Sequence, residues 1–337
     1  MHLFVTGGAG FIGSAFVRLA LVEHPSWRIT NFDALTYAGN LDNLAGLDPA
    51  RHRFIHGDIT DRNAVNAALD GGADALLNFA AESHVDRSIQ SSDAFLRTNI
   101  LGTQVLLDAA RARAIPRFVQ ISTDEVLGCL PDDDAILSRE DAAYAPNNPY
   151  AASKAAAEHL VRAAHRTFGL DAVITRCGNN YGPCQFPEKL IPLVLSNACQ
   201  DQPIPVYGDG MQVRDWIYVD DHCRALLRVL AAGKAGEIYH IGARNERRNL
   251  DVVEAIVKAV SKPASLIRFV ADRPGHDRRY ALDPSKVESQ LGWRPLETWE
   301  SGLAKTIRWY NDNATWLERA RSGSYRAYYR QQYGNGH

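Results

Sequence analysis

A tyrosine and a lysine four residues apart could remove a proton from a hydroxyl group. Tyr150 and Lys154 follow Pro149, and proline favours the first turn of a helix. Residues four apart share a helix face, so the Lys154 ammonium would lie beside the phenol and favour its ionised form. The phenolate could then accept a proton as a hydride leaves. The spacing alone is only suggestive, but its position between two expected strands strengthens the assignment.

Two adjacent carboxyl groups could supply an acid and a base. Asp124 and Glu125 follow Ser122 and Thr123 at the expected end of a strand. In open α/β sheets ligands bind in the crevice beyond such strand ends, where paired carboxyls can divide acid and base work. An isolated Ser-Thr-Asp-Glu would be interpreted as a turn with a helix cap. Because Tyr150 is expected near the same crevice, we favour a catalytic role for this segment over a purely structural one.

A glycine-rich segment near the N-terminus predicts a dinucleotide site. Gly7, Gly10 and Gly13 lie between an expected strand and helix, where they allow a tight turn and close approach to a pyrophosphate. Asp33 follows about 20 residues later, at the end of the next strand, where a carboxylate accepts from ribose hydroxyls and repels a 2′-phosphate. NAD is therefore expected rather than NADP. The alternative is a structural turn with a solvated aspartate.

These motifs need strands and helices that position them. Short apolar runs predict strands at 3–5, 28–32, 53–56, 75–79, 117–122, 172–176 and 236–241. Helical patterns cover 11–23, about 94–113, 149 to about 168, and 250–260. The alternation predicts an α/β fold with a doubly wound parallel Rossmann sheet. Residues 177–192, rich in Gly, Asn and Pro, predict a loop.

Two domains are expected. Residues 1–176 would form the NAD-binding Rossmann domain, to which 216–243 return. Residues 177–215 and 244–337 would form a smaller, mixed substrate domain.

Composition excludes several classes of function. The 337 residues carry a net charge of −2, which offers no electrostatic footprint for nucleic acid or an anionic membrane. No apolar run approaches the ~18 residues of a membrane span, and no leader segment is evident. The five cysteines form no C-x-x-C pair, so neither disulfides nor a metal site is expected and a reducing, cytoplasmic setting is predicted.

Four cations are candidates for binding an anionic ligand. Lys189, Arg214, Arg273 and Arg278 lie in stretches that resemble loops, and arginine suits bidentate binding of a diphosphate. Individually each could be an ordinary surface residue. Three further polar positions have structural interpretations: Asn249 as a helix N-cap, His276 as a structural histidine, and His84 as either a loop residue or a ligand.

Taken together, these motifs resemble the dTDP-glucose 4,6-dehydratases over nearly the whole chain. The matching segments are TGGAGFIGS from Thr6, DALTYAGN from Asp33, GDI from Gly57, NFAAESHVDRSI from Asn78, STDEV from Ser122, PYAASKA from Pro149, NNYGP and QFPEKLIP from Asn179, RDW from Arg214 and DRPGHDRRY from Asp272. In this family the Asp-Glu pair distinguishes dehydratases from epimerases that share the Tyr and Lys.

The resemblance implies a role for each reactive side chain. Tyr150 would be the base for oxidation at C4, and Lys154 would position NAD and lower the tyrosine pKa. Thr123 would hydrogen-bond to the sugar. Asp124 would protonate the leaving C6 hydroxyl, and Glu125 would remove the C5 proton. The implied reaction is loss of water from dTDP-glucose with hydride return to C6, giving a 4-keto-6-deoxy sugar.

The resemblance also implies binding residues and an assembly. Expected NAD contacts are Gly7, Gly10, Phe11, Ile12, Gly13, Asp33, Ala34, Leu35, Thr36, Asp58, Ile59, Phe79, Ala80, Ala81, Glu82, Ser83, Thr98, Tyr150, Lys154 and Asn180. Expected substrate contacts are Ser83, Thr123, Asn179, Lys189, Leu190, Pro205, Val206, Tyr207, Arg214, Asn249, Asp272, Arg273, Pro274, Gly275 and His276. A homodimer through helices of the NAD domain is implied as well.

Three positions depart from the usual family pattern. Leu127 stands where the family usually has tyrosine, and Gly178 and Cys184 replace the more usual serine and tyrosine. The alternatives that the sequence leaves open are a dehydratase of a UDP- or GDP-hexose, a nucleotide-sugar 4-epimerase, and a non-catalytic NAD-sensing scaffold.

Overall fold

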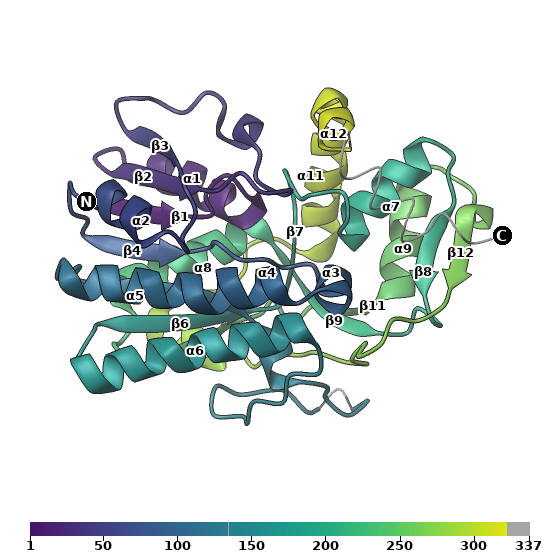
Figure 1. Cartoon of the computed structure of the whole chain (residues 1–337). Helices are drawn as coiled ribbons and strands as arrows, with labels where there is room; N and C mark the ends of the chain where they lie inside the picture. The colour runs from purple at the N-terminus through teal and green to yellow at the C-terminus, as the bar shows by residue number, and fades with distance from the viewer. Residues whose placement is uncertain (134, 322–337) are drawn as a thin grey trace.

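A parallel sheet of seven strands organises the larger part of the molecule (Figure 1). The structure is a computed structural model that describes residues 1–133 and 135–321. The strands are β1 (His2–Thr6), β2 (Arg28–Asp33), β3 (His52–His56), β4 (Ala75–Asn78), β5 (Phe118–Thr123), β6 (Ala172–Cys177) and β10 (Ile238–Ile241). They lie in the order β10-β6-β5-β4-β1-β2-β3, and every pairing is parallel. The doubly wound sheet is confirmed, and the strand order reverses between β1 and β4, where ligands bind in such sheets.

Helices cover both faces of this sheet. On one face lie α1 (Phe11–Glu23), α8 (Val219–Ala232) and α10 (Ser285–Leu291); on the other lie α2 (Arg62–Ala68), α5 (Thr103–Ala112) and α6 (Pro149–Phe168). Alternation along β1 explains the two cores: Leu3 and Val5 pack beneath α1 and α8, whereas Phe4 faces α2 and α5. Buried strands of this kind have continuous apolar sequences because both faces are covered.

A smaller region with mixed strand pairing lies beyond the strand ends (Figure 1). One sheet contains β7 (Asn179–Tyr181), β9 (Val213–Tyr218) and β11 (Glu246–Arg248), in which β9 is parallel to β7 and antiparallel to β11. The other pairs β8 (Ile204–Tyr207) with β12 (Ile267–Val270). The helices here are α7 (Leu190–Cys199), α9 (Asn249–Ala259), α11 (Trp299–Asp312) and α12 (Ala314–Ala320). Buried Trp216, Trp299 and Trp316 contribute to their shared core.

Short helical turns connect these elements near the crevice. They are η1 (Leu41–Leu44), α3 (Val85–Gln90), α4 (Asp93–Phe95), the π-helix η2 (Leu96–Gly102), η3 (Asp124–Leu127) and η4 (Ala264–Leu266). The helix expected at about 94–113 is therefore α4, η2 and α5 in succession. Helices α2, α3 and α8 were not predicted from the sequence.

The loop expected over 177–192 is only partly a loop. It contains β7, whose backbone pairs with β9, and the first turn of α7. Pro192 is accommodated because the first N–H groups of a helix have no partner within it. Within the expected substrate segment, Val287 of α10 and Trp293 pack into the core beneath α1 and α8. The part of that segment from 322 to 337 lies outside the described residues.

A buried ion pair ties α6 to the central strands. Glu158 of α6 and Arg176 of β6 have fully buried side chains, and Arg176 Nη2 lies 2.8 Å from Glu158 Oε2. Glu158 also accepts hydrogen bonds from Ser122 Oγ at 2.6 Å and from Tyr144 at 2.9 Å. Because both oxygens of the Glu158 carboxylate accept hydrogen bonds, the ion pair fixes the position of α6 along β5 and β6.

Removing one charge of this pair should destabilise the protein strongly. Glu158→Gln would leave Arg176 buried without its counter-charge, which costs about 3–5 kcal/mol. Chemical denaturation would measure the loss in free energy of unfolding. As a control, Lys262→Gln breaks the partly exposed pair with Asp201 and should cost only about 0–1 kcal/mol. Equal losses from the two variants would contradict the structural role given to Glu158.

Candidate active site

The glycine loop between β1 and α1 is shaped for close approach of a ligand backbone. Gly7 has a φ of +70°, and a Cβ there would lie 2.5 Å from Ala80 N. At Gly13 a Cβ would lie 2.3 Å from the carbonyl oxygen of Gly7. Side chains are therefore excluded, and the N-terminus of α1 is left without a side-chain cap. Free N–H groups and the helix dipole at such an end favour a pyrophosphate.

Asp33 holds the loop from the end of β2. Its two carboxylate oxygens accept from Ala9 N at 2.9 Å and Leu35 N at 2.8 Å. Burial raises the pKa of Asp33, while these two hydrogen bonds oppose the rise. The carboxylate also borders the cavity described next, so its remaining lone pairs can accept from ribose hydroxyls.

One cavity of about 310 Å³ brings most of the expected NAD residues together. It runs from the glycine loop to the end of β5. Its lining includes Gly7, Gly10, Phe11, Ile12, Gly13, Asp33, Ala34, Thr36, Asp58, Ile59, Phe79, Ala80, Ala81, Glu82, Ser83, Thr98, Thr123, Asp124, Glu125, Tyr150, Lys154, Asn179, Asn180 and Lys189. Leu35, an expected NAD contact, is not part of the lining. The glycine loop of Gly7, Gly10 and Gly13, here called the dinucleotide cradle, has no side chains to obstruct a ligand. Together with the Asp33 carboxylate, it fits a dinucleotide.

Helix α6 places Tyr150 and Lys154 on this cavity. Asn148 caps the helix, Pro149 occupies its first turn, and Gly169 ends it with a left-handed φ of +70°. Lys154 Nζ donates to the carbonyl oxygen of Ile121 at 2.7 Å. Burial lowers the pKa of Lys154 to about 8, although Glu158 opposes this effect.

The expected lowering of the Tyr150 pKa is wrong for the protein without ligands. Burial raises the pKa of Tyr150 well above its usual value, and the charge of Glu125 raises it further. A hydrogen bond with Thr123 opposes the rise. Since Lys154 donates to a backbone carbonyl, its charge does not offset the cost of burying a phenolate.

Asp124 and Glu125 differ sharply in environment. Thr123 accepts from Glu125 N and caps η3. The expected helix cap is therefore present in the same segment that carries the two carboxyl groups. Asp124 is buried, and its Oδ2 has no hydrogen-bond partner among residues 1–133 and 135–321. Burial, followed by the charge of Glu125, raises the pKa of Asp124 to about 8. Glu125 is only half-buried and accepts from Asn148 Nδ2 at 3.1 Å.

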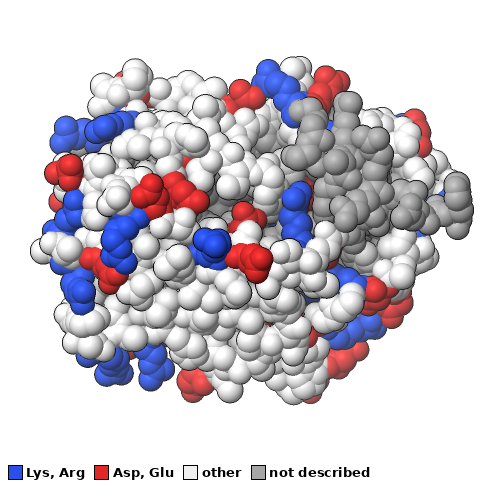
Figure 2. Space-filling model, viewed as in Figure 1, with Lys and Arg blue, Asp and Glu red and all other residues white. Residues whose placement is uncertain are grey.

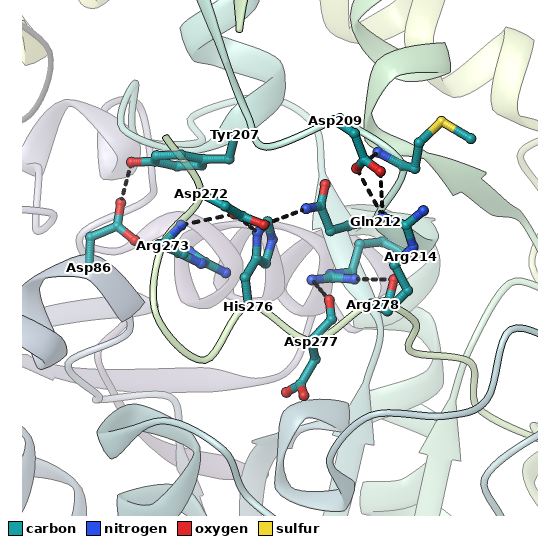
Figure 3. Close-up of polar contacts among 11 residues, drawn as sticks. Asp86, Tyr207, Asp209, Gln212, Arg214, Asp272, Arg273, His276, Asp277 and Arg278 are labelled. Carbon is teal, nitrogen blue, oxygen red and sulfur yellow. Dashed lines mark hydrogen bonds and ion pairs between the residues drawn. The ribbon is translucent and has the colours of Figure 1, made fainter. Parts of the chain in front are cut away.

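A second group of expected residues lies beside the cavity, on the smaller region (Figure 3). Arg214 is buried in strand β9 rather than in a loop. Its guanidinium donates to the carbonyl oxygens of Val213 and Asp277 and lies 4.3 Å from the Tyr280 ring centroid. The charge of Arg214 lowers the pKa of Asp124, which places the arginine within electrostatic reach of the acid pair.

Asp86 of α3 joins the NAD side to the substrate side (Figure 3). It accepts from Tyr207 at 2.9 Å and from Arg273 Nη1 at 3.0 Å. Lys189, at the start of α7, donates to the carbonyl oxygen of Ser83 at 2.8 Å. Two cations expected to bind substrate are thus anchored to the NAD side of the crevice.

Other expected residues have structural partners. His276 Nδ1 lies 2.6 Å from Asp272 Oδ1, and burial lowers its pKa to about 4. His84 caps α3, and burial lowers its pKa well below the usual value. Arg278 pairs with exposed Asp209. Asn249 is the first residue of α9 rather than its N-cap, which is Arg248.

Several expected substrate residues lie outside the lining of the cavity. They are Leu190, Pro205, Val206, Tyr207, Arg214, Asn249, Asp272, Arg273, Pro274, Gly275 and His276. Among the residues that the structure describes, no group of His, Cys, Asp and Glu could hold a metal ion, and no helix is long and apolar enough to cross a membrane.

Comparison with known proteins places this geometry in a family. The family model described as GDP-mannose 4,6 dehydratase matches residues 4–306. The dTDP-glucose 4,6-dehydratase of Xanthomonas campestris pv. campestris (strain B100) is 52% identical, with 96% of each chain covered. The solved dTDP-glucose 4,6-dehydratase DesIV from Streptomyces venezuelae, with NAD bound, is 49% identical, covers 95% of this chain and 100% of its own, and has a TM-score of 0.92.

The chain belongs to the dTDP-glucose 4,6-dehydratase family. A more distant neighbour is the UDP-glucose 4-epimerase of Thermus thermophilus, solved as a complex with NAD. It is 29% identical, with a TM-score of 0.86, and the match covers 93% of this chain and 100% of that one. The fold is therefore shared with epimerases, and the side chains at the end of β5 must decide between the two reactions.

The three departures from the dehydratase family pattern have structural reasons. Leu127 is buried against Ala155 and Leu282, as an apolar residue would be. A Cβ at Gly178 would lie 2.6 Å from the carbonyl oxygen of Asp215, so β9 passes too close for a side chain. Cys184 adopts a φ of +63° and packs against the core that contains Tyr310.

Some polar residues that support the dehydratase site were not predicted from the sequence. Asn99, buried in the π-helix, donates to Glu82 O and to Ser153 Oγ, joining the NAD loop to α6. Cys177 lines the cavity beside Lys154, and Glu188 pairs with Arg87. The only sequence signal for Asn99 was a polar residue within the helix expected at about 94–113, which does not reveal its partner.

The environment of Asp124 predicts a pH dependence. An acid whose pKa is about 8 holds its proton at neutral pH and loses it as the pH rises. Proton delivery should therefore fall about tenfold for each pH unit above about 8, as for any single essential acid. The rate of product formation under kcat/KM conditions would measure this.

Lys154 titrates in the same range, so the two groups must be separated. On the expected roles of these residues, C4 oxidation, followed as NADH absorbance in a single turnover, needs Lys154 but not Asp124. An alkaline fall in water elimination that exceeds the fall in oxidation is the expected result. Identical pH profiles for the two steps would contradict the assignment to Asp124.

Proposed function

We propose that this protein converts dTDP-glucose to dTDP-4-keto-6-deoxyglucose and water. The observation that carries the proposal is the meeting of a phenol, a buried protonated carboxyl and a second carboxyl on one cavity that begins at a dinucleotide cradle. The relatives named above supply the nucleotide and the sugar.

NAD is the cofactor. The glycine cradle and Asp33 fit it, and DesIV, its relative, was solved with NAD bound. When bound, NAD accepts the C4 hydride, returns it at C6, and brings a positively charged ring that favours the phenolate. Because hydride is taken and returned, the reaction has no net redox change.

Oxidation at C4 is assigned to α6 and the end of β5. Tyr150 removes the proton of the C4 hydroxyl, and Thr123, which is hydrogen-bonded to the phenol, is placed to orient the sugar. Lys154 holds a buried positive charge at the floor of the cavity. This ammonium group can donate hydrogen bonds to ribose hydroxyls.

Elimination is assigned to the two carboxyl groups. A ketone at C4 acidifies the C5 proton, which the Glu125 carboxylate removes. Asp124 delivers a proton to the C6 oxygen as water leaves, and its unpaired Oδ2 marks where that oxygen would approach. Burial keeps Asp124 protonated, whereas Glu125 is only half-buried, so their environments suit different tasks.

The diphosphate and base are assigned to the cations on the smaller region. Arg214 and Arg273 flank the acid pair and suit the oxygens of a diphosphate. Ser83, Asn179, Lys189 and the segments around Tyr207 and His276 complete the proposed substrate site. We also propose the division into an NAD domain of residues 1–176 with 216–243 and a substrate domain formed by the rest.

The alternatives explain less of the site. A 4-epimerase shares the fold but needs no acid and base beyond the tyrosine. An NAD-sensing scaffold needs neither the raised pKa of Asp124 nor the cations beside it. A dehydratase that acts on a UDP- or GDP-hexose is the alternative most similar to the proposal, since Arg214 and Arg273 are assigned to the diphosphate and not to the base.

Product analysis tests the proposed function directly. Purified protein with dTDP-, UDP- and GDP-hexoses should give a 4-keto-6-deoxy product fastest from dTDP-glucose, with one solvent deuterium at C5 in D₂O. Asp124→Asn and Glu125→Gln should still form NADH but lose about 10²–10⁴-fold in elimination. In the matched control Tyr150→Phe, NADH formation itself should collapse.

Two outcomes would contradict the proposed function. One is a wild-type product that retains its C6 hydroxyl and differs only at C4. The other is normal 4-keto-6-deoxy formation by both carboxamide variants.

A homodimer through α5 and α6 is part of the proposal. Figure 2 shows a broad surface with few charged side chains over these helices. Leu96 and Leu101 in the adjoining η2 are each 47% exposed. Apolar exposure of this kind on one face supports the proposed interface. All five cysteines are free, which agrees with the proposed cytoplasmic setting.

Sedimentation velocity tests the dimer. Leu101→Glu should produce a monomer, because a buried charge without a partner opposes association. Leu296, 70% exposed elsewhere, gives the control: Leu296→Glu should leave a dimer. A Leu101→Glu variant that sediments like the wild type would rule out this surface.

A further inference from the structure

Asn148 contacts both parts of the proposed catalytic apparatus. Its Oδ1 accepts from Ala151 N at 2.8 Å and thereby caps α6, the helix of Tyr150 and Lys154. Its Nδ2 donates to Oε2 of Glu125 at 3.1 Å. The residue is 6% exposed, so both hydrogen bonds are sheltered from water.

The orientation of this amide follows from its partners. The N–H of Ala151 can only donate, and it therefore requires the oxygen of the amide rather than its nitrogen. The NH₂ group must then face Glu125. A single side chain thus sets where α6 begins and presents a donor to the carboxylate.

A donor at this place has a chemical consequence. The N–H group of Asn148 donates to the carboxyl group of Glu125 and restrains its orientation. It also fixes one oxygen of Glu125 and leaves the other to reach a substrate proton. Three cations on other elements, Lys189, Arg214 and Arg273, also lie within electrostatic reach of Glu125, so a hydrogen bond that holds the carboxylate in one orientation has competing charges to oppose.

The residue before Asn148 is held by the proposed substrate segment. Asn147 Nδ2 donates to Asp277 Oδ1 at 2.6 Å, and a Cβ at Gly275 would lie 2.7 Å from the carbonyl oxygen of Asn147. The Asn148 donor is therefore anchored by α6 on one side and by the 272–277 segment on the other.

We propose that Asn148 is a positioning residue for removal of the C5 proton, acting by holding the Glu125 carboxylate in place. The inference rests on the proposed function, which makes Glu125 the base. It reaches beyond the helix cap, because aspartate caps a helix as well as asparagine does but offers no N–H to Glu125.

Two substitutions separate the cap from the donor. Asn148→Asp keeps the cap and replaces the donor with a repelling charge. Asn148→Gly removes the donor with no new charge, and glycine at an N-cap costs only a few tenths of a kcal/mol. The matched control is Ala152→Gly, at an exposed position in the first turns of the same helix, which weakens α6 without touching Glu125.

The expected result is a split between two steps of one turnover. With dTDP-glucose, both Asn148 variants should form NADH at a rate within about threefold of the wild type. They should lose about 10²-fold in C5 deuterium exchange and in product formation, the low end for loss of a general base. Ala152→Gly should lower the thermal midpoint but leave both rates unchanged.

A double-mutant cycle completes the test. In a Glu125→Gln background, adding Asn148→Asp should cause no further loss of exchange, because the group that it positions is already gone. Full additivity of the two losses would overturn the proposal, as would normal C5 exchange in Asn148→Asp or an equal defect in Ala152→Gly. Failure of the wild type to make NADH and 4-keto product would instead refute the proposed function, so the two failures are distinguishable.

Discussion

Glu158 links the three elements on which the site is built. It lies one helical turn after Lys154 on α6, accepts from Ser122 on β5 and pairs with Arg176 on β6, entirely out of contact with water. Ser122 immediately precedes Thr123, so the carboxylate fixes how far β5 extends relative to α6. If α6 shifted by a turn, the phenol of Tyr150 could not meet Thr123, and a buried charge would lose its partner. The cost of such a loss is several kcal/mol, a large part of the stability of an ordinary domain.

With that register fixed, the turn that follows β5 places the two carboxyl groups in different surroundings. Asp124 points into the protein, where burial keeps it protonated. Glu125, one residue later, meets the amide of Asn148 at the start of α6. In the proposed mechanism, these two adjacent residues of similar chemistry therefore take opposite roles. In that mechanism, the two carboxyl groups at this end of β5 distinguish the site from that of an epimerase, which shares the fold.

The sequence predicts the main sheet well because its signals are local. The buried strands are short apolar runs, and α6 has a start signal in Pro149. The glycine loop and the Tyr150–Lys154 spacing likewise follow from neighbouring residues. The loop predicted over residues 177–192 was partly wrong, because β7 forms only by pairing with β9, which is distant in the sequence. Residues such as Asn99, Asp86 and Asn148 could not be assigned, since their partners are far away in the chain.

The pKa of Tyr150 illustrates a different limit. Spacing correctly places Lys154 on the same helix, but its ammonium is engaged by the carbonyl oxygen of Ile121. Whether a cation lowers the pKa of a neighbour depends on where its charge points and on how deeply the neighbour is buried. Neither quantity is encoded in a four-residue spacing.

The central claim is that one bound cofactor carries a hydride from C4 to C6 of a single sugar. The most direct measurement follows deuterium in a mixture of two substrates. One is dTDP-[4-²H]glucose without ¹³C, and the other is dTDP-glucose that carries ¹³C but no deuterium. Transfer within one sugar predicts that deuterium appears at C6 of the 4-keto-6-deoxy product, only in molecules that lack the ¹³C. Deuterium retained at C4, or deuterium found at C6 of the ¹³C-labelled product, would contradict it.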